Sequence, residues 1–147
     1  MTKAPPKWAQ DLLIDACILL GVEDPPELIW RHCKRWGSSG TGAKNQVVVN
    51  AGSNKTDAKL VLLHEVSHAA TPPSVIEYKP RGIWYGPDGK RRTDLKLKRY
   101  EYHSDAFWDN AWKLFRWVRL PMRYCLQREG NYKRNAIPAY HRSLKRG

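Results

Sequence analysis

The chain has 147 residues, of which 41% are hydrophobic, and it contains seven Trp and seven Tyr. This size and composition suit one globular domain with a real core and exclude a disordered chain. No apolar run approaches the roughly 20 residues that a membrane-spanning helix needs, and the N-terminal stretch lacks the pattern of a signal peptide. The three cysteines, Cys17, Cys33 and Cys125, are dispersed, which favours a reducing compartment over a disulfide framework. We therefore expect one cytoplasmic domain over residues 1–147, with no membrane partner.

The formal net charge is +12, and the positive charge is concentrated in the second half of the chain. Residues 1–73 hold 8 Lys+Arg against 7 Asp+Glu, whereas residues 74–147 hold 18 against 7. A one-sided basic half indicates an anionic partner, most often nucleic acid. Two interpretations stay open at this point: DNA or RNA binding through residues 74–147, or a solvated surface that serves solubility.

The first third of the chain predicts a helix followed by two strands. Residues 7–21 place apolar side chains at helical spacing between a pair of prolines and Gly21, which suits a helix with a proline start and a glycine end. Residues 28–36 and 46–50 have the alternation and β-branched content of strands, and a Gly/Ser-rich turn separates them. We predict that these two strands pair as an antiparallel hairpin.

A second helix is predicted from about Asp57 to Ala70. The stretch AGSNKTDA supplies N-cap candidates, with Thr56 followed by Asp57 in the first turn, where an acidic residue suits the positive end of the helix dipole. The pair Pro72-Pro73 ends the helix, because a residue that precedes proline avoids the helical conformation.

The remainder predicts a hairpin and a further helix. Residues 76–103 form a basic hairpin whose strongest turn signal is Gly-Pro-Asp-Gly at 86–89. Residues 104–118 carry an amphipathic stripe, with Ser104 as the expected N-cap. A basic C-terminal extension, residues 119–147, is predicted to hold one more short helix.

Two histidines and a glutamate lie within the second predicted helix in the pattern His-Glu-x-x-His. Residues four apart lie on one face of a helix, so His64 and His68 present two imidazoles to a common point, as a tetrahedral zinc ion requires. Glu65 lies near enough to reach a metal-activated water without being a ligand. It can accept the proton of that water as general base and pass it to the leaving amine. The pattern therefore predicts a zinc hydrolase.

The alternative is an ordinary core helix that carries two hydrogen-bonded histidines by chance. The apolar residues around the motif argue against it, because burying two histidines and a glutamate among them is costly without partners. A bound metal removes much of this cost. We therefore expect Zn²⁺ as the cofactor.

A catalytic zinc needs a third protein ligand, and three further histidines are available. We predict His103, because it immediately precedes a well-formed amphipathic helix that would hold it rigidly. His32 falls in a predicted strand and His141 in the basic tail, where a structural role is the simpler explanation. Glu101 is the rival, since a glutamate ligand backed by an acidic residue such as Asp105 is a known zinc pattern.

Together these motifs resemble the SprT-like (Spartan-type) zinc metallopeptidases over about residues 28–118. The likeness has four ordered pieces: the strand and turn LIWRHCKRWGSSG, the strand QVVVN, the metal helix LVLLHEVSHAA, and His103-Ser104-Asp105-Ala106-Phe107 at the start of a helix. Ser104 stands where the family usually has glycine. The resemblance implies that His64, His68 and His103 are metal ligands and that Glu65 is the general base.

The resemblance also implies a fold and an activity. The fold is a small zincin-like α+β domain with an N-terminal helix, a short antiparallel sheet, the His-Glu-x-x-His helix, a basic hairpin insertion and a further C-terminal helix. The activity is zinc-dependent endopeptidase cleavage of a protein or peptide substrate, with the basic half holding DNA or RNA near the reaction.

Two other functions stay open. One is an ImmA/IrrE-like peptidase that cleaves repressors, which an acidic third ligand would favour. The other is a non-catalytic, basic nucleic-acid-binding module with a structural zinc, in which Trp84, Tyr85, Tyr100 and Tyr102 serve as stacking platforms. Cross-strand packing within the hairpin is the alternative role for these four aromatics.

Overall fold

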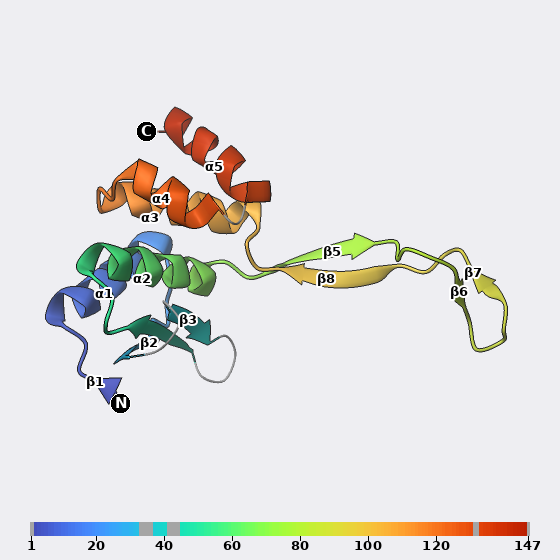
Figure 1. Ribbon diagram of the computed structural model, residues 1–147, viewed down its shortest axis with the longest axis horizontal. Coiled ribbons are helices and arrows are strands. Elements are labelled where there is room, and N and C mark those ends of the chain that lie inside the picture. Colours follow the sequence, from blue (N-terminus) through green and yellow to red (C-terminus); the bar gives the residue numbers. More distant parts are fainter. Residues whose placement is uncertain (1, 33–36, 41–44, 131–132, 147) are drawn as a thin grey trace.

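The computed structural model describes residues 2–32, 37–40, 45–130 and 133–146. The described chain belongs to the α+β class, as predicted, with five helices and eight strands (Figure 1). The helices are α1 (Lys7–Leu20), α2 (Lys55–Ala70), α3 (Asp105–Trp117), α4 (Met122–Glu129) and α5 (Lys133–Arg146). The strands are β1 (Thr2–Lys3), β2 (Glu27–Arg31), β3 (Gly37–Gly40), β4 (Gln46–Asn50), β5 (Ser74–Tyr78), β6 (Trp84–Tyr85), β7 (Arg91–Arg92) and β8 (Leu97–Glu101).

Helix α1 begins and ends where the sequence predicts. Pro6 occupies the N-cap with φ −64°, a value that its ring already fixes. At the other end Gly21 has φ 74°, a left-handed conformation that glycine adopts without strain. The N–H of Val22 closes the helix by donating to the carbonyl of Cys17 at 2.8 Å. The buried face of α1 packs against α2.

The main sheet is mixed, with strand order β1-β2-β4-β3. Strands β2 and β4 run parallel, with Leu28 opposite Val47 and Trp30 opposite Val49. The predicted antiparallel hairpin of these two strands is therefore wrong. Strand β4 itself has the predicted bounds.

Strand β3 explains the difference. Its sequence is Gly-Ser-Ser-Gly, and it pairs antiparallel with β4 in the place where the hairpin partner was expected. Glycine is depleted in strands and serine is no strong strand former, so nothing in this stretch predicts one. Of the predicted strand 28–36, the part up to Arg31 forms β2, and residues 33–36 lie outside the described residues.

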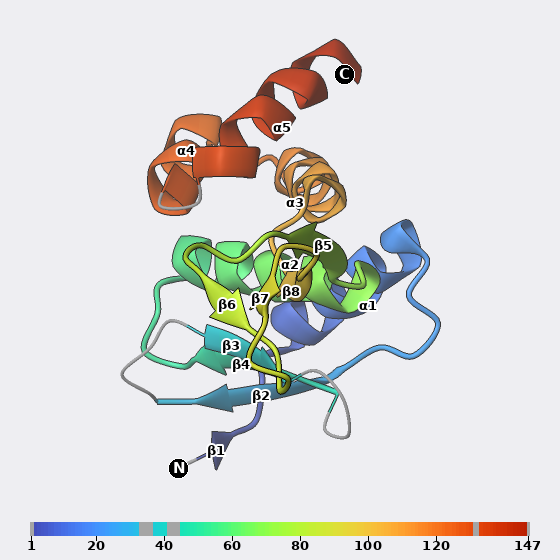
Figure 2. The same cartoon turned by 90° about the vertical axis from the view of Figure 1, so that its right-hand side faces the viewer.

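Helix α2 is the middle layer of the body. Figure 2 shows α1 and α2 on one face of the main sheet, with α3, α4 and α5 beyond α2. A helix between two layers must be apolar on most sides, and Leu62, Leu63 and Val66 of α2 have no exposed surface. Of the N-cap candidates in the sequence, Asn54 is the one used, since its side chain accepts the N–H of Asp57 at 2.8 Å, and the helix begins at Lys55, slightly before the predicted start near Asp57. None of the helices in the described ranges has the length and apolar character that crossing a bilayer requires.

A long hairpin arm extends from the body between α2 and α3 (Figure 1). Its base is the antiparallel pair β5–β8, and its outer part is the antiparallel pair β6–β7. The turn 86–89 closes as predicted, since the N–H of Gly89 donates to the carbonyl of Gly86 at 2.9 Å. The arm lies away from the layers of the body, so its strands have solvent on both faces.

The C-terminal third forms three helices over α2. Ser104 caps α3 as predicted, by accepting the N–H of Phe107 at 3.3 Å. Two helices, α4 and α5, follow it, whereas the sequence predicted only one short helix. The indole N–H of Trp112 donates to the carbonyl of Ala136 at 3.0 Å, which joins α3 to α5 inside the core.

Candidate metal centre

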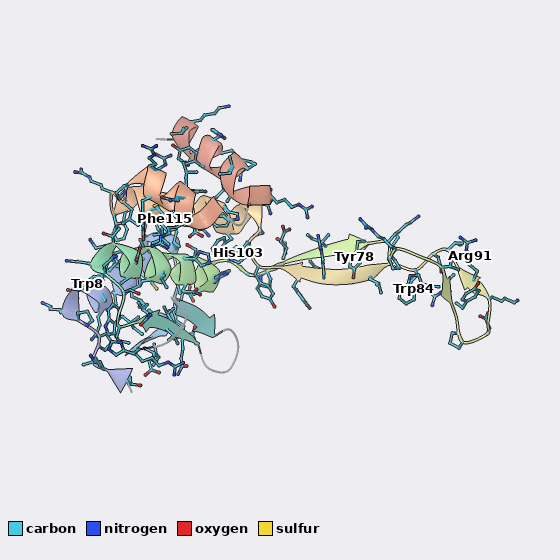
Figure 3. All side chains as sticks on the ribbon, viewed as in Figure 1. Trp8, Tyr78, Trp84, Arg91, His103 and Phe115 are labelled. Atoms are coloured by element: carbon cyan, nitrogen blue, oxygen red, sulfur yellow. The ribbon has the colours of Figure 1, made fainter. Side chains whose placement is uncertain are left out.

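Three histidines meet where the arm joins the body. His64 and His68 lie one turn apart on α2, and His103 lies between β8 and α3, at the position labelled in Figure 3. One ring nitrogen from each imidazole lies within 4.8 Å of those of the other two. The structure therefore brings together the three residues that the sequence selected as metal ligands.

Local structure accounts for the position of His103. Ser104 caps α3 and so fixes where the helix begins, which places the preceding residue next to α2. Asn135 of α5 holds the same segment from the other side. Its side-chain amide donates to the carbonyl of His103 at 3.1 Å and to the carboxylate of Glu101 at 2.7 Å. The segment from Glu101 to His103 is thus held by a helix start and by two hydrogen bonds from a distant helix.

The spacing of one pair of ring nitrogens matches that of a tetrahedral zinc site. Zn–N bonds of about 2.0–2.1 Å at a tetrahedral angle place neighbouring ligand nitrogens about 3.3 Å apart. The Nε2 atoms of His64 and His103 are 3.2 Å apart. Three imidazoles with one position left for water are also the donor set of a catalytic zinc site. The residues present therefore fit this metal.

Glu129 orients the ring of His64, a role that no feature of the sequence predicts. Its carboxylate accepts a hydrogen bond from Nδ1 of His64 at 2.9 Å. A proton on Nδ1 leaves the lone pair of Nε2 directed at the other two histidines, so this contact selects the metal-binding tautomer. Glu129 lies on α4 and is 3% exposed. No local signal marks it, since 65 positions separate the two residues.

Aromatic rings form one wall of the cluster. Phe107 contacts all three imidazoles, with ring-centre distances of 4.9 Å to His64, 4.3 Å to His68 and 4.9 Å to His103. Trp108 stacks on His103 at 5.8 Å. Both aromatic side chains are fully buried. They keep water from this side of the cluster and restrict the rotation of the imidazoles.

The electrostatics keep two of the imidazoles neutral in the metal-free protein. Burial and the positive charge of the neighbouring histidines lower the pKa of His68 to about 3. Burial and the charge of His64 lower the pKa of His103 to about 4. A metal binds the neutral imidazole, so these two side chains are ready to bind one throughout the neutral range.

His64 differs from the other two. Burial lowers its pKa, but the hydrogen bond to Glu129 and the negative charges of Glu129 and Glu65 outweigh burial, so the net pKa is raised. Without a metal, a proton on Nε2 of His64 can be shared with Nε2 of His103 across the 3.2 Å gap. The same contact is therefore compatible with a hydrogen-bonded histidine pair, which is the alternative to a metal site.

Of the remaining candidates, Glu65 adjoins the cluster, whereas Glu101, His32 and His141 stand outside it. Glu65 follows His64 on α2, is 8% exposed and is near enough for its charge to raise the pKa of His64. Glu101, the rival ligand, is not a member of the cluster, and its carboxylate binds Asn135 instead. His32 and His141 are both exposed and stand outside the cluster.

Comparison of the chain with protein-family models, with curated proteins and with solved structures gives no match.

Proposed function

We propose that the protein is a zinc-dependent peptidase whose metal is held by His64, His68 and His103. The convergence of these three imidazoles, one turn apart on α2 and at the start of α3, carries the proposal. A structural zinc site usually has four protein ligands, whereas a catalytic site has three and an open position. Within the described ranges the cluster contains these three residues, which supports a catalytic role.

In this proposal Glu65, Glu129 and Phe107 each have a different role in the reaction. A zinc ion supplies Lewis-acid activation of water and of the substrate carbonyl at such a site. Glu65 acts as the general base that takes a proton as the peptide carbonyl is attacked, and then as the acid that gives it to the leaving amine. Glu129 holds His64 in the required tautomer. Phe107 keeps the rear of the cluster dry.

The main sheet offers a way to bind an extended peptide. Strand β3 lies at one end of the strand order, and it packs beside α2, which carries the two histidines. A peptide that pairs with an edge strand gains main-chain hydrogen bonds regardless of its sequence. This placement favours a peptide over a small-molecule substrate, and it accords with a SprT-like assignment of the chain.

A comparison of Glu65→Gln with the unchanged protein tests the proposal. Both proteins should bind one zinc ion per chain, measured by elemental analysis, while only the unchanged protein cleaves denatured casein or itself. Glu77→Gln, which removes an exposed carboxylate on β5, is the matched control and should cleave normally. Cleavage that persists in Glu65→Gln would refute the assigned base. A chain that takes up no zinc would refute the metal centre.

A further inference from the structure

The arm, defined as residues 74–101, carries an unusual amount of exposed apolar surface. An isolated two-stranded hairpin is at best marginally stable in water, and here neither face of β5–β8 is covered. The exposed large hydrophobic residues of the described chain nevertheless concentrate on or beside it: Val75, Tyr78, Ile83, Trp84, Tyr85, Tyr100 and Tyr102. Exposed apolar surface of this extent marks an interaction site.

The charge of the arm identifies an anionic partner. Residues 74–101 hold eight Lys+Arg against four Asp+Glu. Cations lie directly opposite aromatic residues in the outer part of the arm. Trp84 is paired across the strands with Arg92, and Tyr85 is paired with Arg91. The guanidinium of Arg99 lies over the ring of Tyr78 at 5.8 Å. Positive charge and exposed rings therefore occupy the same surface.

A pocket of about 200 Å³ lies where the two halves of the arm meet. Its lining includes Lys79, Trp84, Arg91 and Arg92, and Figure 3 shows Trp84 and Arg91 near the outer end of the arm. The indole N–H of Trp84 donates to the carbonyl of Arg81 at 3.0 Å, which holds the ring in place while 46% of the residue stays exposed. The pocket thus combines a fixed aromatic face with three cationic side chains.

We propose that the arm binds single-stranded nucleic acid, with a base stacked on Trp84 and the backbone phosphates on Lys79 and Arg91. Bases within a duplex are stacked on one another, whereas a single strand offers base faces to protein rings. The aromatic residues would have no role in binding a duplex through its phosphates. This inference does not depend on the peptidase activity, because no part of the metal cluster takes part in it.

A membrane surface is the other anionic partner to consider, and the strand register argues against it. A membrane-binding element gathers its apolar residues on one face and its cations on the other. In the pair β5–β8, Tyr78 and Arg99 share one face, and Tyr100 and Lys98 share the opposite face. Rings and cations on both faces suit a flexible strand that wraps the arm, not a flat bilayer.

Fluorescence anisotropy with labelled oligonucleotides tests the proposal. Probes of about 15 nucleotides lie at the upper end of the site sizes that single-strand-binding domains cover. The probes are one mixed sequence as single-stranded DNA, as single-stranded RNA and as duplex DNA. We expect the zinc-loaded full chain to bind either single strand more tightly than the duplex. Trp84→Leu should weaken single-strand binding by roughly tenfold. Arg91→Ala should reduce the slope of log affinity against log salt by about 0.7.

Matched controls come from the body of the protein. Trp117→Leu removes another exposed tryptophan, and Lys113→Ala another exposed cation, both on α3; neither should change binding. Circular dichroism and thermal unfolding report that each variant is folded, whether or not it holds zinc. Equal affinity for duplex and single strand, or full binding by Trp84→Leu, would overturn the proposal. So would binding to phosphatidylserine vesicles with no affinity for the oligonucleotides, which would assign the arm to a membrane surface.

Discussion

The carboxylate of Glu129 accepts a hydrogen bond from Nδ1 of His64 at 2.9 Å, and this contact joins α4 to the helix that carries two of the three clustered histidines. A carboxylate behind a ligand histidine fixes its ring orientation and raises its basicity. Helix α4 therefore helps to hold the three-histidine cluster in place.

Glu129→Gln should weaken zinc binding by about tenfold, at the lower end of the 10–100-fold range for such partners. Glutamine has nearly the same shape, so the pocket stays filled, but it lacks the charge that strengthens the contact with His64. Competition with a chelator measures the affinity. Glu77→Gln, on the exposed arm, should match the unchanged protein. Equal zinc affinity in Glu129→Gln would show that the contact has no influence on the metal.

Phe107→Leu should loosen the metal centre more than it destabilises the fold. Phe107 contacts all three imidazoles, so a smaller side chain leaves them room to rotate. Phe115→Leu is the matched control, because Phe115 is also fully buried but its ring packs on Trp112. Both variants should lose about 1–2 kcal/mol of unfolding free energy. Only Phe107→Leu should lose zinc affinity; equal losses would reduce Phe107 to an ordinary core residue.

Asn135→Ala should weaken zinc binding by releasing the segment before α3. The side chain of Asn135 makes two hydrogen bonds to that segment, to Glu101 and to the carbonyl of His103. Each such hydrogen bond contributes about 1 kcal/mol to the stability of the fold. Without them the segment is held less firmly, and His103 can move away from α2. Asn110→Ala, which loses a hydrogen bond to Thr71 instead, is the control. Unchanged zinc affinity in Asn135→Ala would mean that the cap at Ser104 suffices to position His103.

The sequence predicted the parts of the site that depend on local geometry. His64, Glu65 and His68 follow from the helical repeat, which fixes their relative directions within one turn. Ser104, which fixes where α3 begins, follows from the capping pattern, whereas the contact of Phe107 with the imidazoles was not predicted. The structure also brings His103 to the other two histidines, as predicted, through the packing of α3 against α2.

The contacts that the sequence missed join distant segments. Glu129 and Asn135 reach the site only because α4 and α5 fold back over α2 and α3 (Figure 2), and no periodicity encodes that packing. The parallel pairing of β2 with β4 was missed for a different reason. The strand that separates them in sequence, β3, is made of glycine and serine, whose weak strand preference yields to pairing with β4.

The stability of the metal-free protein should depend on pH in a way that reflects the cluster. The pKa values of His68 and His103 are about 3 and 4 in the folded state, against 6.5 ordinarily. At pH values between the folded and the ordinary pKa, these two histidines bind more protons in the unfolded chain than in the folded one. The free energy of unfolding therefore falls as pH falls from about 6.5 towards 4. His64, with its raised pKa, opposes part of this loss.

Urea denaturation of the metal-free protein at about pH 7.5, 6 and 4.5 measures this dependence. A His68→Ala, His103→Ala double variant should lose stability less steeply over the same interval, because it lacks the two groups that resist protonation in the folded state. His141→Ala, which removes an exposed histidine outside the cluster, should retain the steep dependence. If the double variant and the unchanged chain show the same slope, the two imidazoles are not held neutral by burial, and zinc would then have to displace protons from all three histidines.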